Sequence, residues 1–357
     1  MAQLVPLVMD AEGDYKLLIG LNTTIGQLGV LISGFSLPYL ARRFQGRTMV
    51  LTAVALLIVA MLGFAFLQPR WGWFAARFLA GLCISILFTT SETWIQSSAT
   101  DQSRARVMGL YMSMLTVTFG VGPFLIPFTG FAGPWPWFVG MGTMAFGFLV
   151  MSFLAVEESA HYQKGARFLA TLAKAPLVFI CVGFTTLFEA IMLSFFTLYA
   201  IAEGLSLARA TSLLGFGIAA GLLFFYPIGQ LADRWSRRGT IFVCASVAIV
   251  CCLLQPYFIA SWLIWPLIVL LRAGAFGTYL NGFAMLGDRF KGAELVTASA
   301  LVSILWGVGG LLGPPLTGYA IDHVGIWLLP LIMASCYVPV LIASGVNLRA
   351  SAASNSL

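Results

Sequence analysis

Long apolar runs separated by short polar connections limit what this chain of 357 residues can fold into. Hydrophobic residues make up 60% of it and charged residues 9%, which is more apolar surface than a soluble domain of this length can bury. A helix that crosses about 30 Å of hydrocarbon needs about 20 residues, and no run shows the period-two alternation of a membrane barrel. The sequence therefore predicts an all-α membrane protein. Eleven spanning helices are expected, at about residues 17–40, 49–68, 72–96, 107–130, 135–155, 176–200, 209–231, 240–259, 262–286, 295–320 and 326–347.

A sequence repeat is visible at a spacing of 191 residues, where Leu40–Arg47 returns as Leu231–Arg238. Further landmarks follow in the same order, and they predict two homologous halves. These landmarks are Arg77 with Arg272 at a spacing of 195, and Gly122-Pro123 with Gly313-Pro314 at 191.

The repeat divides the chain into two helical bundles, which we expect at residues 1–155 and 176–347. A cytoplasmic linker should lie between them at 156–175, and a polar tail should follow at 348–357.

The same spacing also predicts an incomplete first span. The counterpart of the span at 176–200 would begin before residue 1, and only Leu4–Met9 would remain of it. Six residues are too few to cross a bilayer. We therefore expect a twelve-span plan whose first span is truncated or missing, either through a misassigned start or through a genuine loss.

Basic residues are concentrated on one set of connections. Fourteen of the 19 Lys and Arg residues lie there, against three on the opposite set and two within spans. The positive-inside bias assigns the richer set to the cytoplasm, which predicts a cytoplasmic C-terminus. Because these residues form no continuous basic stripe, nucleic acid is not an expected partner.

The segment Gly229–Arg238 resembles the signature G-x-L-A-D-R-x-x-R-R of the major facilitator superfamily, found between two helices of one half. The resemblance implies two rocking helical bundles and a conformational latch at the cytoplasmic boundary. The alternative is that these residues are positive-inside anchors only. The first-half copy departs from the pattern because Arg42 replaces the acid. The latch candidates are Gly229, Asp233, Arg234, Arg237 and Arg238.

Two further motifs resemble the same superfamily. Arg77–Gly81 is similar to its fourth-helix motif, which implies an arginine that faces a central cavity, with Arg272 as its repeat mate. An arginine within hydrocarbon costs about 2.5–3.5 kcal/mol, so such a residue faces protein or water, or else snorkels to the interface. Gly120–Pro123 is similar to a fifth-helix motif typical of exporters, although Gly and Pro are common in membrane helices in general. The helix-packing candidates are Gly120, Gly122, Pro123, Gly309, Gly313 and Pro314.

Two short runs, Ser91–Ile95 and Arg104–Tyr111, resemble a bacterial subgroup of the superfamily, the YcaD-like transporters. The resemblance implies a multi-pass protein of the bacterial inner membrane, and it supplies no substrate.

Two acidic residues are candidates for proton or substrate binding. Glu189 lies near the middle of a span, where a carboxylate can exchange a proton for substrate. The alternative is a structural hydrogen bond to a neighbouring helix. Glu92 lies near the cytoplasmic end of a span beside Trp94, where an interfacial role is equally plausible.

No catalytic or nucleotide-binding motif is present, and the two histidines lie at segment ends, so we expect neither an enzyme nor a cofactor or metal site. The sequence predicts a monomeric secondary transporter in the lipid bilayer that exports a small amphiphilic molecule by proton antiport. Uptake of a metabolite, or a non-transporting remnant without its first helix, are the alternatives.

Overall fold

The computed structural model describes residues 3–67, 71–98, 104–153, 168–290 and 293–345, and every regular element in these ranges is helical. Nine of the described helices are long and apolar enough to cross a membrane, or ten if the bent pair α9–α10 forms one span. The all-α expectation is confirmed, whereas the expected count of eleven spans is not reached by this criterion. If the bent pair is counted as one span, the missing eleventh span is α5 (Arg104–Thr129), in which only the shorter apolar stretch Ser113–Thr129 is found.

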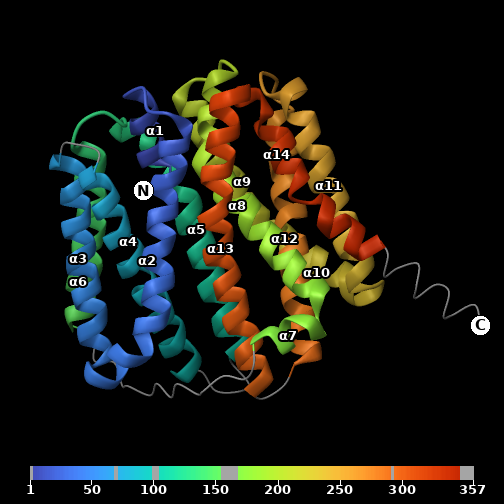
Figure 1. Cartoon of the computed structure of the whole chain (residues 1–357), viewed down its shortest axis with the longest axis horizontal. Helices are drawn as coiled ribbons and strands as arrows, with labels where there is room; N and C mark the ends of the chain where they lie inside the picture. The colour runs from blue at the N-terminus through green and yellow to red at the C-terminus, as the bar shows by residue number, and fades with distance from the viewer. Residues whose placement is uncertain (1–2, 68–70, 99–103, 154–167, 291–292, 346–357) are drawn as a thin grey trace, which may run out of the picture. The chain divides into compact units, whose positions relative to one another are not determined.

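The chain divides into two compact units, which we describe separately (Figure 1). The N-terminal unit comprises Leu21–Leu115 and Leu125–Tyr162, and the C-terminal unit comprises Met1–Gly20, Thr116–Phe124 and Gln163–Leu357. The expected linker at 156–175 lies partly, and the expected tail wholly, outside the described residues.

Three long helices and most of two others build the N-terminal unit. They are α2 (Lys16–Arg43), α3 (Gly46–Phe66), α4 (Trp71–Ser98), α5 (Arg104–Thr129) and α6 (Trp135–Phe153). Helices α3, α4 and α6 meet around three aromatic rings, and the Phe64 and Trp137 rings stack with their centroids 4.9 Å apart. Trp73 meets the Phe64 ring edge-on at 5.6 Å. Such pairs contribute about 0.5–1.5 kcal/mol beyond the area they bury.

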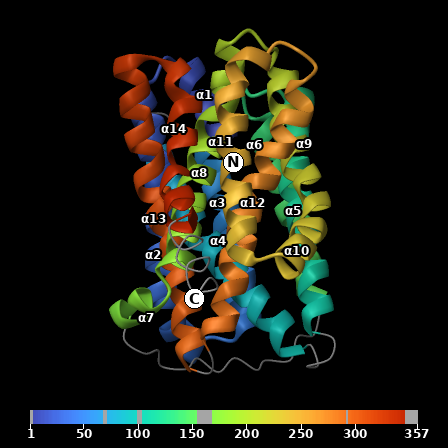
Figure 2. The same ribbon diagram turned by 90° about the vertical axis from the view of Figure 1, so that its right-hand side faces the viewer.

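The C-terminal unit contains the remaining helices. They are α1 (Leu4–Ala11), α7 (Phe168–Lys174), α8 (Pro176–Ala202), α9 (Leu207–Gly221), η1 (Leu222–Phe224), α10 (Phe225–Arg234), α11 (Arg237–Phe258), α12 (Ile264–Arg289), α13 (Ala293–Val324), η2 (Ile326–Leu328) and α14 (Leu329–Ser335). Helix α8 packs against both α12 and α13, and α11 lies along α12 (Figure 2). The proline Pro176 starts α8 at a position where a missing N–H costs nothing. The Ser236 hydroxyl caps α11 by accepting a hydrogen bond from the Gly239 N–H at 2.9 Å.

The spacing of 191 residues extends to the helix boundaries. Helix α2 and the combined segment α9–η1–α10 begin and end 191 residues apart, although α2 is continuous and the second copy bends by 43°. The short α1 ends at Ala11 and α8 ends at Ala202, again 191 residues apart. Gly13 and Gly204 follow these ends with positive φ angles of 80° and 90°. A left-handed glycine is the usual way to end a helix, so the two turns have one cause.

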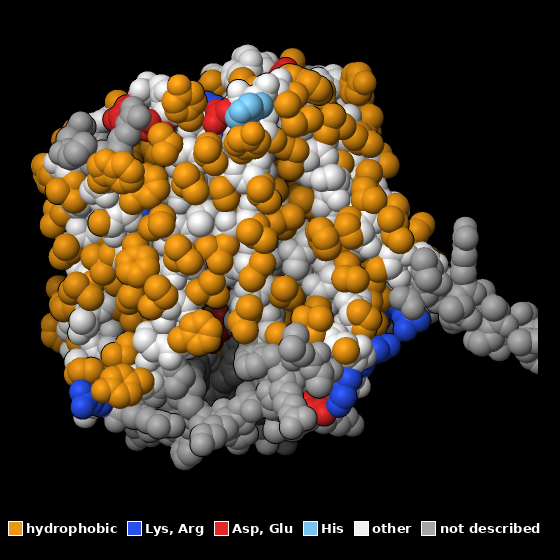
Figure 3. All heavy atoms as spheres, viewed as in Figure 1, with side chains coloured by type: hydrophobic (Ala, Val, Ile, Leu, Met, Phe, Trp, Pro, Cys, Tyr) orange, Lys and Arg blue, Asp and Glu red, His pale blue; other side chains and the backbone are white. Residues whose placement is uncertain are grey.

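Apolar side chains cover the outside of the molecule. On the face seen in Figure 3, hydrophobic side chains dominate and most visible charged side chains lie near the upper and lower edges. Large rings such as Phe35, Phe153 and Tyr257 are largely exposed. Each helix satisfies its own backbone hydrogen bonds, so these helices can lie in a bilayer. An apolar surface of this extent would be unfavourable in water.

Candidate functional site

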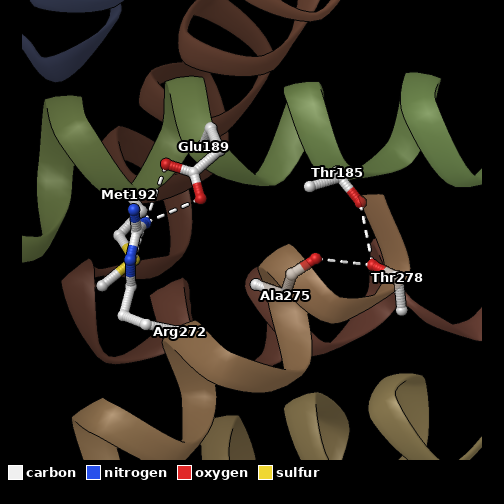
Figure 4. Close-up of polar contacts among 6 residues, drawn as sticks. All are labelled: Thr185, Glu189, Met192, Arg272, Ala275 and Thr278. Carbon is white, nitrogen blue, oxygen red and sulfur yellow. Dashed lines mark hydrogen bonds and ion pairs between the residues drawn. The ribbon is translucent and has the colours of Figure 1, made fainter. Parts of the chain in front are cut away.

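A buried ion pair joins two of the sequence candidates, Glu189 and Arg272, at the contact between α8 and α12. Arg272 Nη1 donates to both carboxylate oxygens of Glu189 at 2.7 Å (Figure 4). The two residues are 4% and 2% exposed, so water does not screen the pair. Two charges can be buried only when they form an ion pair with each other. Removal of one partner lowers the free energy of unfolding by about 3–5 kcal/mol.

The surroundings of the arginine are apolar or soft. Met192 Sδ lies 3.5 Å from Arg272 Nη1, and the guanidinium carbon lies 4.7 Å from the centre of the Phe276 ring. On the α9 side, glycines make room for the arginine stem, because a Cβ on Gly217 would lie 3.3 Å from Arg272 Cγ. The guanidinium is therefore held by packing on its faces and by Glu189 at one nitrogen.

A pair of hydroxyls continues the polar contact between the same two helices. Thr185 lies one turn before Glu189 on α8, and its hydroxyl is 3.1 Å from the hydroxyl of Thr278 on α12. Thr278 in turn donates to the Ala275 carbonyl oxygen at 2.6 Å (Figure 4). Neither threonine is among the candidates predicted from the sequence. The spacing of four residues between Thr185 and Glu189, which puts both on one helix face, is the signal that would have found Thr185.

Tyr337 is a third buried group that the sequence did not single out. It follows α14, its ring meets the Phe188 ring edge-on at 5.1 Å, and it is fully buried. Its hydroxyl makes no hydrogen bond of normal geometry, although Thr185 and the Glu189 carboxylate interact with it.

Arg77 occupies the comparable place in the N-terminal unit. A Cβ on Gly26 of α2 would lie 3.1 Å from Arg77 Nε, just as one on Gly217 would contact Arg272. The two glycines are 191 residues apart, whereas the arginines are 195 apart. One helical turn thus separates the arginine positions, yet both side chains lie against equivalent glycines.

Glu92 lies apart from the ion pair, in the N-terminal unit. It is half-buried near the end of α4 and interacts electrostatically with Tyr111 of α5. The structure therefore brings together Glu189 and Arg272 in one unit, while Arg77 and Glu92 belong to the other.

The latch candidates lie where α10, α11 and α12 meet. Asp233 is 73% exposed and 3.9 Å from Arg237, one turn further along the chain. The closer contact of Arg237 is with Asp288 at the end of α12, at 3.2 Å. The sequence analysis does not identify Asp288, which lies on α12, outside the family motif. Arg234 is exposed, Arg238 is half-buried, and nothing lies within 4 Å of a Cβ added to Gly229.

The glycine and proline candidates differ in how closely they pack. A Cβ on Gly309 would lie 2.7 Å from the backbone nitrogen of Leu187, and one on Gly313 3.2 Å from the Leu187 carbonyl oxygen, so both allow α13 to approach α8. Gly120 lies against α9, where its Cβ would be 3.0 Å from the Gly215 carbonyl oxygen. Pro123 and Pro314 are buried, and the Pro314 carbonyl lies against Gly20. In contrast, Gly122 is exposed with nothing within 4 Å of an added Cβ.

Comparisons with known proteins agree with this architecture. The chain is 23% identical over 323 residues to the uncharacterized MFS-type transporter YfkF of Bacillus subtilis (strain 168), covering 88% of this chain and 82% of that one. It is 24% identical over 337 residues to the uncharacterized MFS-type transporter YcaD of Escherichia coli O7:K1, covering 93% and 87%.

A solved structure has the same fold. A bacterial homologue of the human lysosomal transporter Spinster, in an inward-facing and occupied conformation, matches with a TM-score of 0.75 at 14% identity, over 98% of this chain and 93% of that one. The family model of the Major Facilitator Superfamily matches residues 4–281. The chain therefore belongs to the major facilitator superfamily, as a transporter and not an enzyme.

Proposed function

We propose that this secondary transporter moves a small amphiphilic molecule by alternating access and couples the movement to protons through Glu189. The main observation in support is the Glu189–Arg272 ion pair, in which a carboxylate and a guanidinium are buried together within membrane-spanning helices. Ionisable groups at this depth are costly and are typically kept for substrate or proton pathways. Export is favoured by the resemblance of Gly120–Pro123 to the exporter motif; metabolite uptake is the alternative direction.

The membrane orientation is part of the same proposal. Arg237 and Asp288, and likewise Lys174 and Glu294 with the Lys174 nitrogen 2.5 Å from the carboxylate, mark one end of the C-terminal unit. At the other end, Asp322 accepts hydrogen bonds from the backbone nitrogens of Lys16 and Leu17 at 2.8 Å each. The basic end would face the cytoplasm of a bacterial inner membrane, together with the C-terminus.

Substitution of Glu189 tests the coupling. Proteoliposomes that contain the full chain and an internal pH dye would be screened with small amphiphilic compounds, and the wild-type protein should move protons when a substrate is added. Glu189→Gln should abolish this proton movement, because glutamine cannot gain or lose a proton. Arg209→Gln, at an exposed helix end, is the matched control and should leave it unchanged. Proton movement of wild-type size in Glu189→Gln would show that Glu189 does not couple.

A second prediction concerns the latch. Asp288→Asn should lower the free energy of unfolding by at most about 1 kcal/mol, because a half-exposed ion pair contributes little to stability. Transport should fall several-fold all the same, since the pair between α11 and α12 would no longer favour one conformation. Thermal unfolding and transport rate would be measured together, with Glu203→Gln, an exposed acidic residue outside the latch candidates, as the control. Equal transport rates in Asp288→Asn and the control would show that the latch candidates act only as membrane anchors.

A further inference from the structure

We propose that the substrate carries a negatively charged group, that this group binds Arg272 in place of the Glu189 carboxylate, and that it travels together with a proton. The proposal rests on the function proposed above and adds the chemical class of the substrate. It also replaces the expected exchange of proton for substrate by movement of both in one direction, which under an inward proton gradient corresponds to uptake, the alternative direction given above.

The first argument is the incomplete use of the arginine. A guanidinium has five N–H donors in a planar fork, but Glu189 takes both of its hydrogen bonds from Nη1. Arg272 Nε is buried and has no hydrogen-bond partner. A carboxylate or sulfonate would occupy the fork with two parallel bonds, which the end-on contact of Glu189 does not provide. The arginine is thus held and yet left with an unused donor.

The second argument is the place prepared for Glu189 after it leaves. The Tyr337 hydroxyl is also buried, and it interacts with both Glu189 and Thr185 without a hydrogen bond of normal geometry. A protonated Glu189 that turns from Arg272 to Tyr337 would satisfy it. Arg272 Nε and the Tyr337 hydroxyl therefore flank the ion pair without a hydrogen bond of normal geometry, and both gain better partners when a proton and an anion arrive.

The third argument is charge balance. Arginine keeps its proton in proteins, so Arg272 needs a negative partner at every step of the cycle. Protonation of the Glu189 carboxylate removes that partner, and one monoanion replaces it. The net charge of the site is then unchanged. A cationic substrate would instead compete with Arg272 for Glu189 and leave the buried guanidinium unpaired.

No other charged side chain of the surrounding helices can take over these roles. Within the described ranges, the remaining charged residues of the helices that pack on α8 lie near helix ends: Asp10 of α1, Lys174 of α7, Arg209 of α9, Asp288 and Arg289 of α12, and Glu294 and Asp322 of α13. The titratable groups beside Tyr337 are the thiols of Cys252 and Cys336.

Proton uptake on anion binding tests the proposal. The full chain in detergent and weak buffer near neutral pH would be titrated with benzoate, 1-naphthoate and 1-naphthalenesulfonate, with 1-naphthamide and 1-naphthylmethylammonium as the matched neutral compound and cation. At least one anion should raise the melting temperature and bind with uptake of about one proton, because binding is linked to protonation of Glu189.

Variants make the test specific. Glu189→Gln should bind the same anion at least about tenfold more tightly and without proton uptake. In the wild-type protein the Glu189 carboxylate occupies Arg272 in most protein molecules and so weakens anion binding, and the variant lacks this competitor. Glu189→Gln with Arg272→Gln, a neutral pair that leaves no buried charge, should fold and should not bind it.

Two results would overturn the proposal. If none of the anions stabilises the wild-type protein or Glu189→Gln, or if the cation binds and releases a proton, the substrate is not an anion at Arg272. Proton release with the cation would still leave Glu189 as the coupling group. Binding of any ligand without proton movement, in the wild-type protein, would instead contradict the proton coupling itself.

Discussion

Arg272→Gln should lower the free energy of unfolding by about 3–5 kcal/mol, because the Glu189 carboxylate would remain buried without its partner. The double variant Glu189→Gln, Arg272→Gln should recover most of this loss, since two amides can hydrogen-bond to each other without a buried charge. Denaturant unfolding of the purified protein, followed by tryptophan fluorescence, would measure both values.

The ion pair between Arg237 and Asp288 is the natural control for this experiment. It also joins an arginine to a carboxylate within the same unit, but its side chains are 31% and 57% exposed. Arg237→Gln should therefore cost at most about 1 kcal/mol. If Arg272→Gln and Arg237→Gln are equally stable, or if the double variant is no more stable than Arg272→Gln, the buried pair does not hold α8 to α12.

Gly81→Ala should destabilise the N-terminal unit by about 1–3 kcal/mol, the usual cost of inserting one methyl group into a close-packed contact. An added Cβ at Gly81 would overlap the carbonyl oxygen of Gly26, which belongs to the backbone of α2 and cannot rotate away. Helices α2 and α4 would have to separate. Arg77 belongs to α4 and would move with it, away from Gly26, against which its side chain lies.

Gly34→Ala is the matched control, also on α2. Gly34 is exposed and has nothing within 4 Å of an added Cβ. Alanine favours a helix interior over glycine by up to about 1 kcal/mol, so this variant should be neutral or more stable. Melting temperatures of both variants in one detergent would decide the matter. A stability of Gly81→Ala equal to that of Gly34→Ala would mean that the two helices do not depend on the close approach.

The sequence predicted the helical architecture well because the bilayer leaves little choice. Each apolar run must satisfy its own backbone hydrogen bonds, so run length determines the helices. The helix boundaries in the structure follow the repeat spacing of 191 residues, for example in α2 and α9–α10. It did not predict the 43° bend in the second copy, because Gly221–Phe224 contains no proline or charge that marks a break.

Contacts between helices were predicted less well. The sequence assigned the latch to Asp233, which follows the family motif, whereas the structure places Arg237 nearer to Asp288. Asp233 and Arg237 are neighbours on the chain, so a motif can include both. Asp288 lies on another helix, and only the packing of α11 on α12 brings it close.

The amino-acid sequence by itself determined that this protein is helical, spans a membrane and belongs to the major facilitator superfamily, and its repeat predicts two related halves. It also identified Glu189 and Arg272 separately, because charged residues within apolar runs stand out. Only the tertiary structure decided that they form one site. The two residues are 83 positions apart, and their meeting depends on how α8 crosses α12. That crossing is determined by side-chain packing along both helices, which no local pattern in either helix encodes.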